Sequence, residues 1–447
     1  MLLEFKTKNY KSFVEEASFL MVAAPKQKGL DYSLMKTKIK GKEIKGLSSS
    51  VIYGPNAAGK TNIIGAMDVL RAIVLRGNIR NSEEKSSPNP AAAALELIPN
   101  NNEMESKPVC FEIEFYEEDG ENHKFKIHYE LEVDLGTFLE EEHQRKILAE
   151  MLEVNGERVF ERTQDLKIEN LKVIKDYLSD ITEQNAESVN EIAKNSLNQE
   201  ELFLTNGFKL IFSPKFTKLI VDWFTNKFMV IYRADSMQLI KRFADPKKKA
   251  IYVEKTTDEA AKLFGINSNA VGYVVSDDEP DAKLYSVFKN MKNKKTTAVA
   301  ADIFESYGTI RFINMFPLVI KAMQTGGTLV VDEFDASIHP IALMSIINVF
   351  HNDDVNIHHA QLIFNTHNPI FLNSNLFRRD EIKFVERDDD THDSVLYALS
   401  DFGTTGDKGV RKHEDYMSKY FISQYGAIKD IDFTPIFEEI LCDEKEG

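Results

Sequence analysis

The residues best suited to chemistry form a glycine-rich loop, Gly54-Pro55-Asn56-Ala57-Ala58-Gly59-Lys60-Thr61. Its G-x-x-x-x-G-K-[ST] spacing lets backbone N–H groups close around a phosphate chain, because glycine tolerates the backbone angles that this requires. We expect Lys60 to reach the β- and γ-phosphates of a nucleotide and the Thr61 hydroxyl to ligate Mg²⁺. The residues predicted to bind nucleotide here are Gly54, Asn56, Gly59, Lys60, Thr61 and Asn62.

The sequence on both sides of this loop favours the same interpretation. Residues 51–53 (Val-Ile-Tyr) form a short apolar strand, and Ile63, Ile64, Met67 and Leu70 fall on one face of a helix that follows. The N-terminus of that helix adds partial positive charge beneath the phosphates. An Asn-Lys-x-Asp segment, which GTPases use, does not occur in the sequence. The predicted cofactors are therefore ATP and Mg²⁺.

An acidic pair after an apolar segment supplies the second half of the predicted site. Residues 328–331 (Thr-Leu-Val-Val) end at Asp332 and Glu333. Carboxylates at a strand end are common in any protein, so the pair gains meaning only beside a phosphate loop. In that setting we expect Asp332 to hold Mg²⁺. We expect Glu333 to orient the attacking water and deprotonate it as a general base.

Three further segments carry polar groups that could act near the γ-phosphate. Ser306 offers a hydroxyl group, and Gly308 offers backbone that no side chain covers. Such a segment is also typical of an ordinary turn. Asp335 opens the stretch 335–340, close behind the acidic pair. His367 ends the apolar run that begins at residue 361, and a histidine there is often structural. Given its order in the chain, we interpret His367 as a catalytic switch residue that contacts the γ-phosphate.

Taken together, these segments resemble the ATP-binding-cassette branch of P-loop proteins, the heads of SMC-type proteins included. The resemblance implies a phosphate loop at 54–61, a signature segment at 306–309, an acidic strand end at 332–333, a D-loop at 335–340 and a switch histidine at 367. It also implies that two heads sandwich two ATP molecules. Ser306 and Gly308 would then reach the nucleotide of the opposite head, and Asp335 would join the nucleotide-binding residues.

Two details of this resemblance concern individual residues. The signature departs from the usual Leu-Ser-Gly-Gly form, because Glu305 replaces the leucine and Tyr307 replaces the first glycine. Residues 9–13 (Asn-Tyr-Lys-Ser-Phe) resemble the early strand-loop of SMC-type heads, in which a basic residue approaches the nucleotide. The resemblance assigns that role to Lys11. We place no Q-loop.

The last third of the chain also resembles the bacterial abortive-infection ATPases, including the ATPase subunits of AbiL-type and PARIS-type anti-phage systems. The segments that carry this resemblance are 326–335, 337–340, 361–367 and 378–382. It implies an ATPase that senses phage infection, with a phage protein as a candidate trigger, and that works with a separately encoded effector, often a Toprim-like nuclease. The Asp388-Asp389-Asp390 segment contains D-x-D, but an acidic turn explains it better than a nuclease site.

Bulk composition limits the kinds of partner. The 447 residues carry a formal charge of −16. The chain as a whole will therefore not bind DNA nonspecifically through counterion release. Direct binding of nucleic acid would need a local basic cluster, which solvated loop charge explains more simply. The candidate clusters are Lys241, Arg242, Lys247, Lys248, Lys249 and Lys255, and Lys289, Lys292, Lys294 and Lys295.

Composition also bears on location. No apolar run approaches the ~20 residues of a membrane span, and the first residues do not have the pattern of a secretory signal. Cys110 and Cys442 are the only cysteines, which suits a reducing compartment and excludes a disulfide framework. We therefore expect a cytoplasmic protein with no membrane partner.

The predicted fold class is α/β, an ABC-ATPase-like head with a mixed or parallel P-loop sheet and antiparallel N-terminal strands, plus an inserted helical arm. Strands at 111–115 and 125–133 alternate with period two, whereas 329–331 and 361–364 are continuously apolar, as in buried parallel strands. We expect an N-terminal lobe at 1–160, the helical arm at 161–300 and a C-terminal lobe at 301–447. Residues 81–107 are expected to form a long polar loop.

Three functions remain open from the sequence. The leading hypothesis is an ATP-hydrolysing sensor that forms a homodimer or higher homo-oligomer around ATP and controls an effector. The second is a structural scaffold that ATP holds together with little turnover. The third is an SMC-like DNA-repair head, which the acidic charge and the short arm disfavour. The role of the arm, whether it binds a phage protein, the effector or nucleic acid, is left open.

Overall fold

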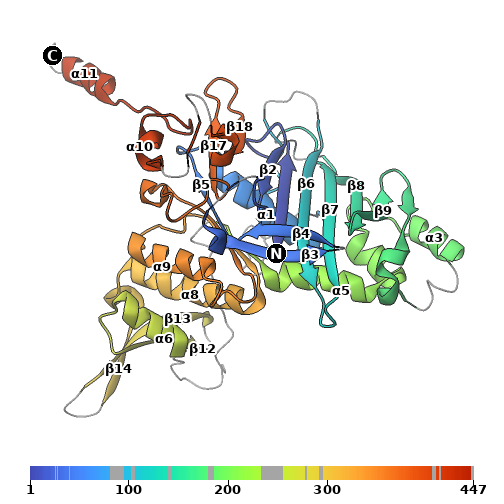
Figure 1. The fold of residues 1–447 in the computed structure, drawn as a ribbon, viewed down its shortest axis with the longest axis horizontal. Helices are drawn as coiled ribbons and strands as arrows, with labels where there is room; N and C mark the ends of the chain where they lie inside the picture. Colours follow the sequence, from blue (N-terminus) through green and yellow to red (C-terminus); the bar gives the residue numbers. More distant parts are fainter. Residues whose placement is uncertain are drawn as a thin grey trace.

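The computed structural model describes residues 1–447 except 26, 28, 40, 81–94, 102–105, 139, 141–142, 180–185, 233–254, 277–278, 291–294, 405–408, 412–413 and 444–447. Most of the predicted polar loop at 81–107, most of the first basic cluster (241–255) and half of the second (Lys292 and Lys294) therefore lie outside the described residues. Figure 1 shows two large sheets with helices beside them, and the helix α11 extending away from the sheets near the C-terminus.

A six-stranded sheet carries the phosphate loop. Its order is β11-β15-β16-β5-β17-β18, and every neighbouring pair is parallel except β17 with β18. The bounds are β11 (Phe228–Ile231), β15 (Thr328–Val331), β16 (Gln361–Asn365), β5 (Ser49–Tyr53), β17 (Ile382–Arg387) and β18 (Ser394–Ala398). Strands β5, β15 and β16 are buried along their whole length, which confirms the prediction of strands covered on both faces.

Helices cover both faces of this sheet. Val330 and Ile363 face the hydrophobic core that contains α1 (Lys60–Arg76). The neighbouring Leu329 and Leu362 face a second core. That core includes side chains of α8 (Tyr307–Thr325) and α9 (Pro340–His351). Pro340 is the first residue of α9.

An antiparallel seven-stranded sheet packs on the other side of α1. Its order is β10-β9-β8-β7-β6-β1-β2. The bounds are β1 (Leu2–Lys8), β2 (Ala17–Leu20), β6 (Val109–Glu118), β7 (Lys124–Asp134), β8 (Lys146–Val154), β9 (Glu157–Arg162) and β10 (Leu166–Ile168). Burial alternates along β6 and β7, so one face of the sheet packs on the core and the other faces outward. The alternating strands predicted at 111–115 and 125–133 are confirmed as the antiparallel pair β6 and β7, and β17 and β18 form a second antiparallel pair.

Residues 161–300 are only partly helical: besides α3 (Ala186–Asn195), α5 (Pro214–Asp222) and α6 (Lys255–Phe264) they contain strands, which the expectation of a helical arm did not include. They contain the end of β9 and all of β10, they supply edge strand β11 of the central sheet, and they form a separate three-stranded antiparallel sheet. We call this last unit the small sheet; it consists of β12 (Ala270–Ser276), β13 (Glu279–Lys289) and β14 (Thr296–Ala300). The polar composition suggested helices because strand preference depends on burial and on the neighbouring strands, so polar strands leave a weak signal in the sequence.

Shorter elements complete the described chain. They are η1 (Asp31–Ser33), β3 (Leu34–Ile39), β4 (Lys42–Leu47), η2 (Leu171–Tyr177), α3 (Ala186–Asn195), η3 (Leu204–Phe208), α4 (Lys209–Ile211), α5 (Pro214–Asp222), η4 (Trp223–Lys227), α6 (Lys255–Phe264), α7 (Ala301–Phe304), η7 (Pro369–Phe371), η8 (Leu399–Phe402), α10 (Tyr416–Phe421) and α11 (Thr434–Asp443). Trp223 stacks on Phe115 with ring centroids 3.9 Å apart, so it belongs to the core. Within the described chain, every helix is too short or too polar to cross a membrane.

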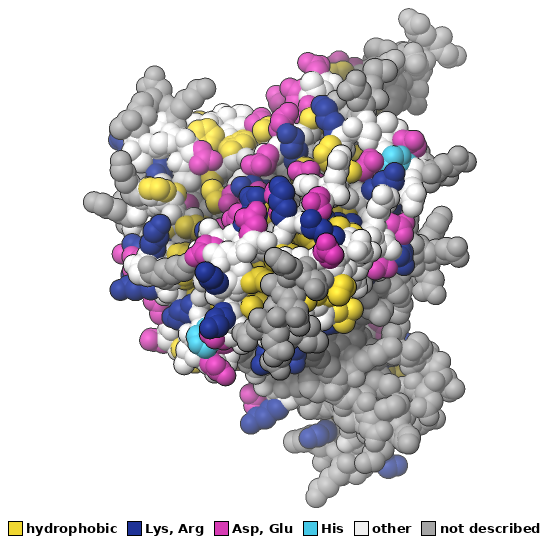
Figure 2. Space-filling view, turned by 90° about the vertical axis from the view of Figure 1, so that its right-hand side faces the viewer, with side chains coloured by type: hydrophobic (Ala, Val, Ile, Leu, Met, Phe, Trp, Pro, Cys, Tyr) yellow, Lys and Arg dark blue, Asp and Glu magenta, His cyan; other side chains and the backbone are white. Residues whose placement is uncertain are grey.

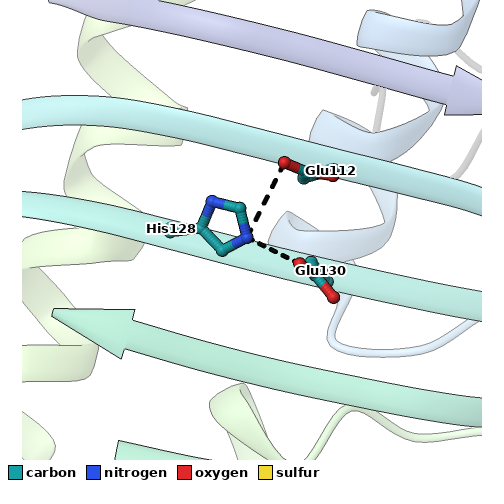
Figure 3. A group of neighbouring side chains, drawn as sticks. All are labelled: Glu112, His128 and Glu130. Atoms are coloured by element: carbon teal, nitrogen blue, oxygen red, sulfur yellow. Dashed lines mark hydrogen bonds and ion pairs between the residues drawn. The ribbon is translucent and has the colours of Figure 1, made fainter. Parts of the chain in front are cut away.

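A charged cluster lies on the outer face of the seven-stranded sheet (Figure 3). The Nε2 of His128 lies 2.7 Å from Glu130 Oε1 and 3.7 Å from Glu112 Oε1, while Nδ1 lies 3.8 Å from Glu114 Oε2. Lys6 donates a 2.8 Å hydrogen bond to Glu112. Burial alone would lower the pKa of His128, but the hydrogen bond to Glu130 and the surrounding carboxylates outweigh it and raise that pKa. The cluster is therefore an ion-pair network that His128 joins when protonated.

This network predicts a pH-dependent contribution of His128 to stability. Because the folded-state pKa is raised, the contribution is fully present below the unfolded pKa of about 6.5 and is lost as the pH rises through the folded value. We expect His128→Gln to lower the free energy of unfolding by about 0.5 kcal/mol at acidic pH and by less at alkaline pH. Urea unfolding at both pH values measures the difference. The control is His392→Gln, at an exposed histidine. An equal deficit at the two pH values would contradict the assignment.

Candidate nucleotide-binding site

The phosphate loop joins β5 to α1, and its glycines are required by close packing. Gly54 has φ +156°, and a Cβ there would lie 2.2 Å from the Val385 carbonyl oxygen. Gly59 has φ +110°, and a Cβ there would lie 2.7 Å from the hydroxyls of both Ser12 and Ser394. Any larger side chain would therefore push the loop away from β17 and from the segments beside it.

The loop borders a cleft of about 200 Å³. The residues that line it are Asn56, Ala57, Ala58, Gly59, Lys60, Thr61, Asn62, Glu333, Asn365 and His367. The structure thus brings together seven of the predicted nucleotide-binding or catalytic residues, five from the phosphate loop and the start of α1 and two from distant parts of the chain, with Asn365 as an addition. Gly54 and Asp332 lie directly behind this lining, where they contact Lys60 and Thr61.

Lys60 is buried beneath the loop. Its Nζ donates hydrogen bonds to the carbonyl oxygens of Gly54 (2.7 Å) and Pro55 (2.9 Å). Burial lowers the pKa of Lys60 to about 8, against the opposing effect of the carboxylates of Asp332, Glu333 and Asp335. The side chain therefore keeps its positive charge at neutral pH while it lies where a phosphate chain would enter.

The carboxylates are positioned by the ends of β15 and β16. Thr61 Oγ1 donates to Asp332 Oδ1 over 3.1 Å, and Asn365 Nδ2 donates to the same oxygen over 2.5 Å. The side-chain oxygen of Asn365 also accepts from the backbone N–H of Glu333. Glu333 has φ +50°, in the left-handed region. Asn365 thus fixes both acidic residues, and the strained backbone turns the chain at Glu333.

The oxygen ligands suit Mg²⁺. A threonine hydroxyl and an aspartate carboxylate are hard donors, which Mg²⁺ prefers, and Thr61 and Asp332 already lie within hydrogen-bond distance of each other. These two residues would hold the ion, as the sequence predicts.

His367 and Asp335 flank the cleft. Burial, together with the charge of Lys60, lowers the pKa of His367, so its imidazole is neutral at pH 7. Asp335 Oδ2 accepts a 2.6 Å hydrogen bond from Thr366 Oγ1. Asp335 therefore lies behind the lining and braces the segment that carries His367.

The signature segment begins α8 and does not line the cleft of its own chain. Ser306 is the N-cap of the helix and accepts a 3.1 Å hydrogen bond from the Thr309 N–H. A Cβ at Gly308 would lie 1.9 Å from the Ser337 carbonyl oxygen, so this glycine packs against the D-loop. The expected contact of Ser306 and Gly308 with the nucleotide of a second copy stays a prediction.

Lys11 is not among the residues that line the cleft. Its Nζ lies 2.7 Å from Glu96 Oε2 and 3.0 Å from the Tyr232 hydroxyl, and this ion pair holds it outside the cleft lining. The neighbouring Ser12 takes its place beside the loop, because its Oγ accepts a 2.8 Å hydrogen bond from Asn62 Nδ2.

Several site residues had no signal in the sequence analysis. Ser394 donates to the Ala58 carbonyl oxygen over 2.6 Å, and its N–H donates to the Ser12 carbonyl oxygen over 2.7 Å. Arg311, on α8, donates to the carbonyl oxygens of Asp332 (3.4 Å) and Glu333. Only Asn365 could have been found, because it is a polar residue at the end of a predicted buried strand.

A phosphate loop at the carboxyl end of a parallel strand, facing an acidic strand end, defines a P-loop nucleotide-binding domain. A family model described as "AAA domain, putative AbiEii toxin, Type IV TA system" matches residues 49–373. The chain belongs to this family of AAA-type ATPase domains. A search of curated proteins finds no significant match.

Solved structures of SMC heads are similar over most of their length. The "SMC head domain from Thermotoga maritima" is 13% identical, with 89% of this chain and 98% of that chain covered and a TM-score of 0.34. An Smc head from Pyrococcus furiosus with an extended coiled coil, bound to the C-terminal domain of ScpA, is 12% identical, with 89% and 96% covered and a TM-score of 0.38. Both TM-scores are below 0.5, so the α/β fold class is assigned from the two large sheets described above.

The position of Lys60 predicts its role in nucleotide affinity. We expect Lys60→Ala to weaken binding of a fluorescent ATP analogue by at least about a hundredfold, because a buried charge-assisted contact to phosphate is lost. For the parental protein, affinity should fall as the pH rises through about 8, where Lys60 loses its proton. Lys36→Ala, at an exposed lysine, is the control. Unchanged affinity of Lys60→Ala in a titration would remove Lys60 from the site.

The bridging role of Asn365 predicts different pH behaviour for two variants. Asn365→Ala leaves the Glu333 N–H unpaired and should cost about 2 kcal/mol of unfolding free energy at every pH. Asn365→Asp places a second carboxylate against Asp332, so its deficit should shrink as the pH is lowered, because added protons relieve the repulsion between two like charges. Urea unfolding of both variants tests this. The interpretation fails if both deficits respond equally to pH.

Proposed function

We propose that this protein binds ATP with Mg²⁺ in the cleft and hydrolyses the γ-phosphate. The observation that carries this proposal is the convergence of Lys60, Glu333 and His367 on one cleft, with Thr61 and Asp332 in contact beside it. Membership in a family of AAA-type ATPase domains supports the same reaction.

The proposed reaction uses side chains already in place. A water oxygen bonds to the γ-phosphorus while the bond to the β,γ-bridging oxygen breaks, which gives ADP and phosphate, and the Glu333 carboxylate accepts the proton of the water. Lys60 and the loop N–H groups stabilise negative charge on the phosphate oxygens. Mg²⁺, when bound, neutralises part of that charge. The neutral His367, which lines the same cleft, would hydrogen-bond the γ-phosphate.

A second copy of the chain is part of the proposal. Ser306 and Gly308 lie outside the cleft of their own chain, so they can act on a nucleotide only from another copy. Tyr307 is 58% exposed and Ile341, which follows the D-loop, is 69% exposed. Large exposed apolar side chains beside these segments favour an interface there. ATP would close this interface, and hydrolysis would open it.

The biological role proposed is regulation in a bacterial anti-phage defence system of the abortive-infection type. The resemblance of residues 326–382 to abortive-infection ATPases supports this, and the matching family model is described by a toxin of a toxin–antitoxin system. The protein would respond to a phage trigger and control a separately encoded effector such as a Toprim-like nuclease. The Asp388 carboxylate accepts from the N–H groups of Asp390 (3.0 Å) and Thr391 (2.7 Å), so an acidic turn accounts for the D-x-D segment.

Direct action on DNA receives less support. Figure 2 shows acidic and basic side chains interleaved over the described part of the face it presents. Mixed charge of this kind gives little counterion release. We therefore favour control of a partner protein over an SMC-like role on DNA.

The role of Glu333 as the base predicts a separation of binding from turnover. We expect Glu333→Gln to bind ATP with parental affinity, to lose at least about a hundredfold in kcat, and to accumulate ATP-bound dimers. Phosphate release and native mass spectrometry with and without ATP measure these effects. Glu386→Gln, at another strand-borne glutamate, is the control. Turnover of Glu333→Gln at the parental rate would refute the assignment. A parental protein with ATP-dependent oligomers but no turnover would favour the scaffold hypothesis.

A further inference from the structure

Glu305, directly before the signature segment, is a buried carboxylate with an unusual set of partners. Its Oε1 accepts hydrogen bonds from the hydroxyls of Ser286 (2.9 Å) and Ser268 (3.1 Å), and its Oε2 accepts a longer one from the Asn267 N–H (3.4 Å). Glu305 is only 7% exposed and Ser286, on β13, is fully buried. Within the described part of the chain, no basic side chain forms an ion pair with it. The described hydrogen-bond donors to the Glu305 carboxylate are therefore all uncharged: two hydroxyl groups and one backbone N–H.

Such an arrangement costs free energy that an apolar residue would avoid. A buried carboxylate is tolerated only when its hydrogen bonds are made, and a leucine could fill the same volume without them. The carboxylate differs from a leucine in being directional, because it fixes the distance and angle to each donor. Glu305 therefore ties the small sheet to the start of α8 in one geometry.

The start of α8 is in turn tied to the acidic strand end. Ser306 caps the helix, and Arg311 lies little more than one turn further on. The Arg311 guanidinium donates to the carbonyl oxygens of Asp332 and Glu333. A continuous path of contacts thus leads from Ser286 through Glu305 and Arg311 to the backbone that positions Glu333.

A second contact keeps the small sheet attached if this path is cut. Phe264, on α6, stacks on Phe312 of α8 with ring centroids 4.3 Å apart. Asp258, also on α6, accepts a 2.9 Å hydrogen bond from the Val271 N–H of β12. Loss of the Glu305 hydrogen bonds should therefore loosen the geometry without detaching the sheet.

We propose that Glu305 is a positioning residue for the hydrolysis reaction, through which the small sheet sets the geometry of Glu333. This inference rests on the proposed function for its catalytic readout. A shift of the small sheet moves Glu305, the first turn of α8 and Arg311 together, and so changes the placement of the base, while Lys60 keeps its hydrogen bonds to the phosphate loop. The small sheet is then the part of the molecule on which a regulator can act.

The experiment compares variants that remove different parts of the link. Glu305→Gln keeps the oxygen that both serines contact and should retain most activity. Ser286→Ala removes one donor and should be intermediate. Glu305→Leu removes every hydrogen bond and should lower kcat at least about tenfold, because small displacements of a catalytic group are costly. Affinity for the fluorescent ATP analogue should change by less than about twofold in each variant, since the phosphate loop is intact. Thr297→Ala, on exposed β14, is the control.

A structural role alone would give a different result. Unchanged kcat in Glu305→Leu, or a loss of kcat that matches a loss of folded protein in circular dichroism, would overturn the proposal. So would equal losses in Glu305→Gln and Glu305→Leu, because the first keeps the serine contacts.

Hydrogen exchange tests the link independently of turnover. A non-hydrolysable ATP analogue should slow amide exchange in residues 283–289 of β13 in the parental protein but not in Glu305→Leu. The same response in both proteins would overturn the proposal. A parental protein that shows this response without hydrolysing ATP would refute the proposed ATPase function while leaving the link between cleft and small sheet in place.

Discussion

The nucleotide cleft depends on the register of three buried parallel strands, β5, β15 and β16. Val331 pairs with Phe364, so the next residues along β15 and β16, Asp332 and Asn365, lie side by side. The carboxyl ends of parallel strands meet at one edge of a sheet, where ligands bind. A slip of one residue would turn Asn365 toward the opposite face, and both acidic residues would lose the amide that fixes them.

Opposing electrostatic effects in this cleft make its residues interdependent. Burial lowers the pKa of Lys60, while Asp332, Glu333 and Asp335 raise it. Lys60 in turn contributes to lowering the pKa of His367. One cation thus remains charged and the histidine remains neutral at pH 7, a combination that suits binding of phosphate by the first and hydrogen bonding by the second. A change to any one carboxylate would alter the ionisation of both bases.

The first turns of α8 form a junction between distant parts of the chain. Gly308 packs against Ser337 after the acidic pair, and Arg311 reaches the carbonyl groups of that pair. Glu305 binds the small sheet. In the proposed dimer, the same turns would meet the nucleotide of the other copy. The N-terminal turns of α8 would then link three events: movement of the small sheet, closure of the dimer and placement of Glu333.

The sequence determined the phosphate loop, the acidic pair and the strands that present them, because each depends on local patterns. A glycine spacing, a continuous apolar run and an alternating run are visible within ten residues. The sequence did not predict the strands within residues 161–300, where pairing with neighbouring strands overrides a weak local preference. It did not predict the ion pair of Lys11 with Glu96, which joins positions far apart in the chain, and the role of Lys11 at the nucleotide stays a prediction. Ser394, Arg311 and the partners of Glu305 were decided by tertiary structure alone, since only folding brings their donors and acceptors within hydrogen-bond distance.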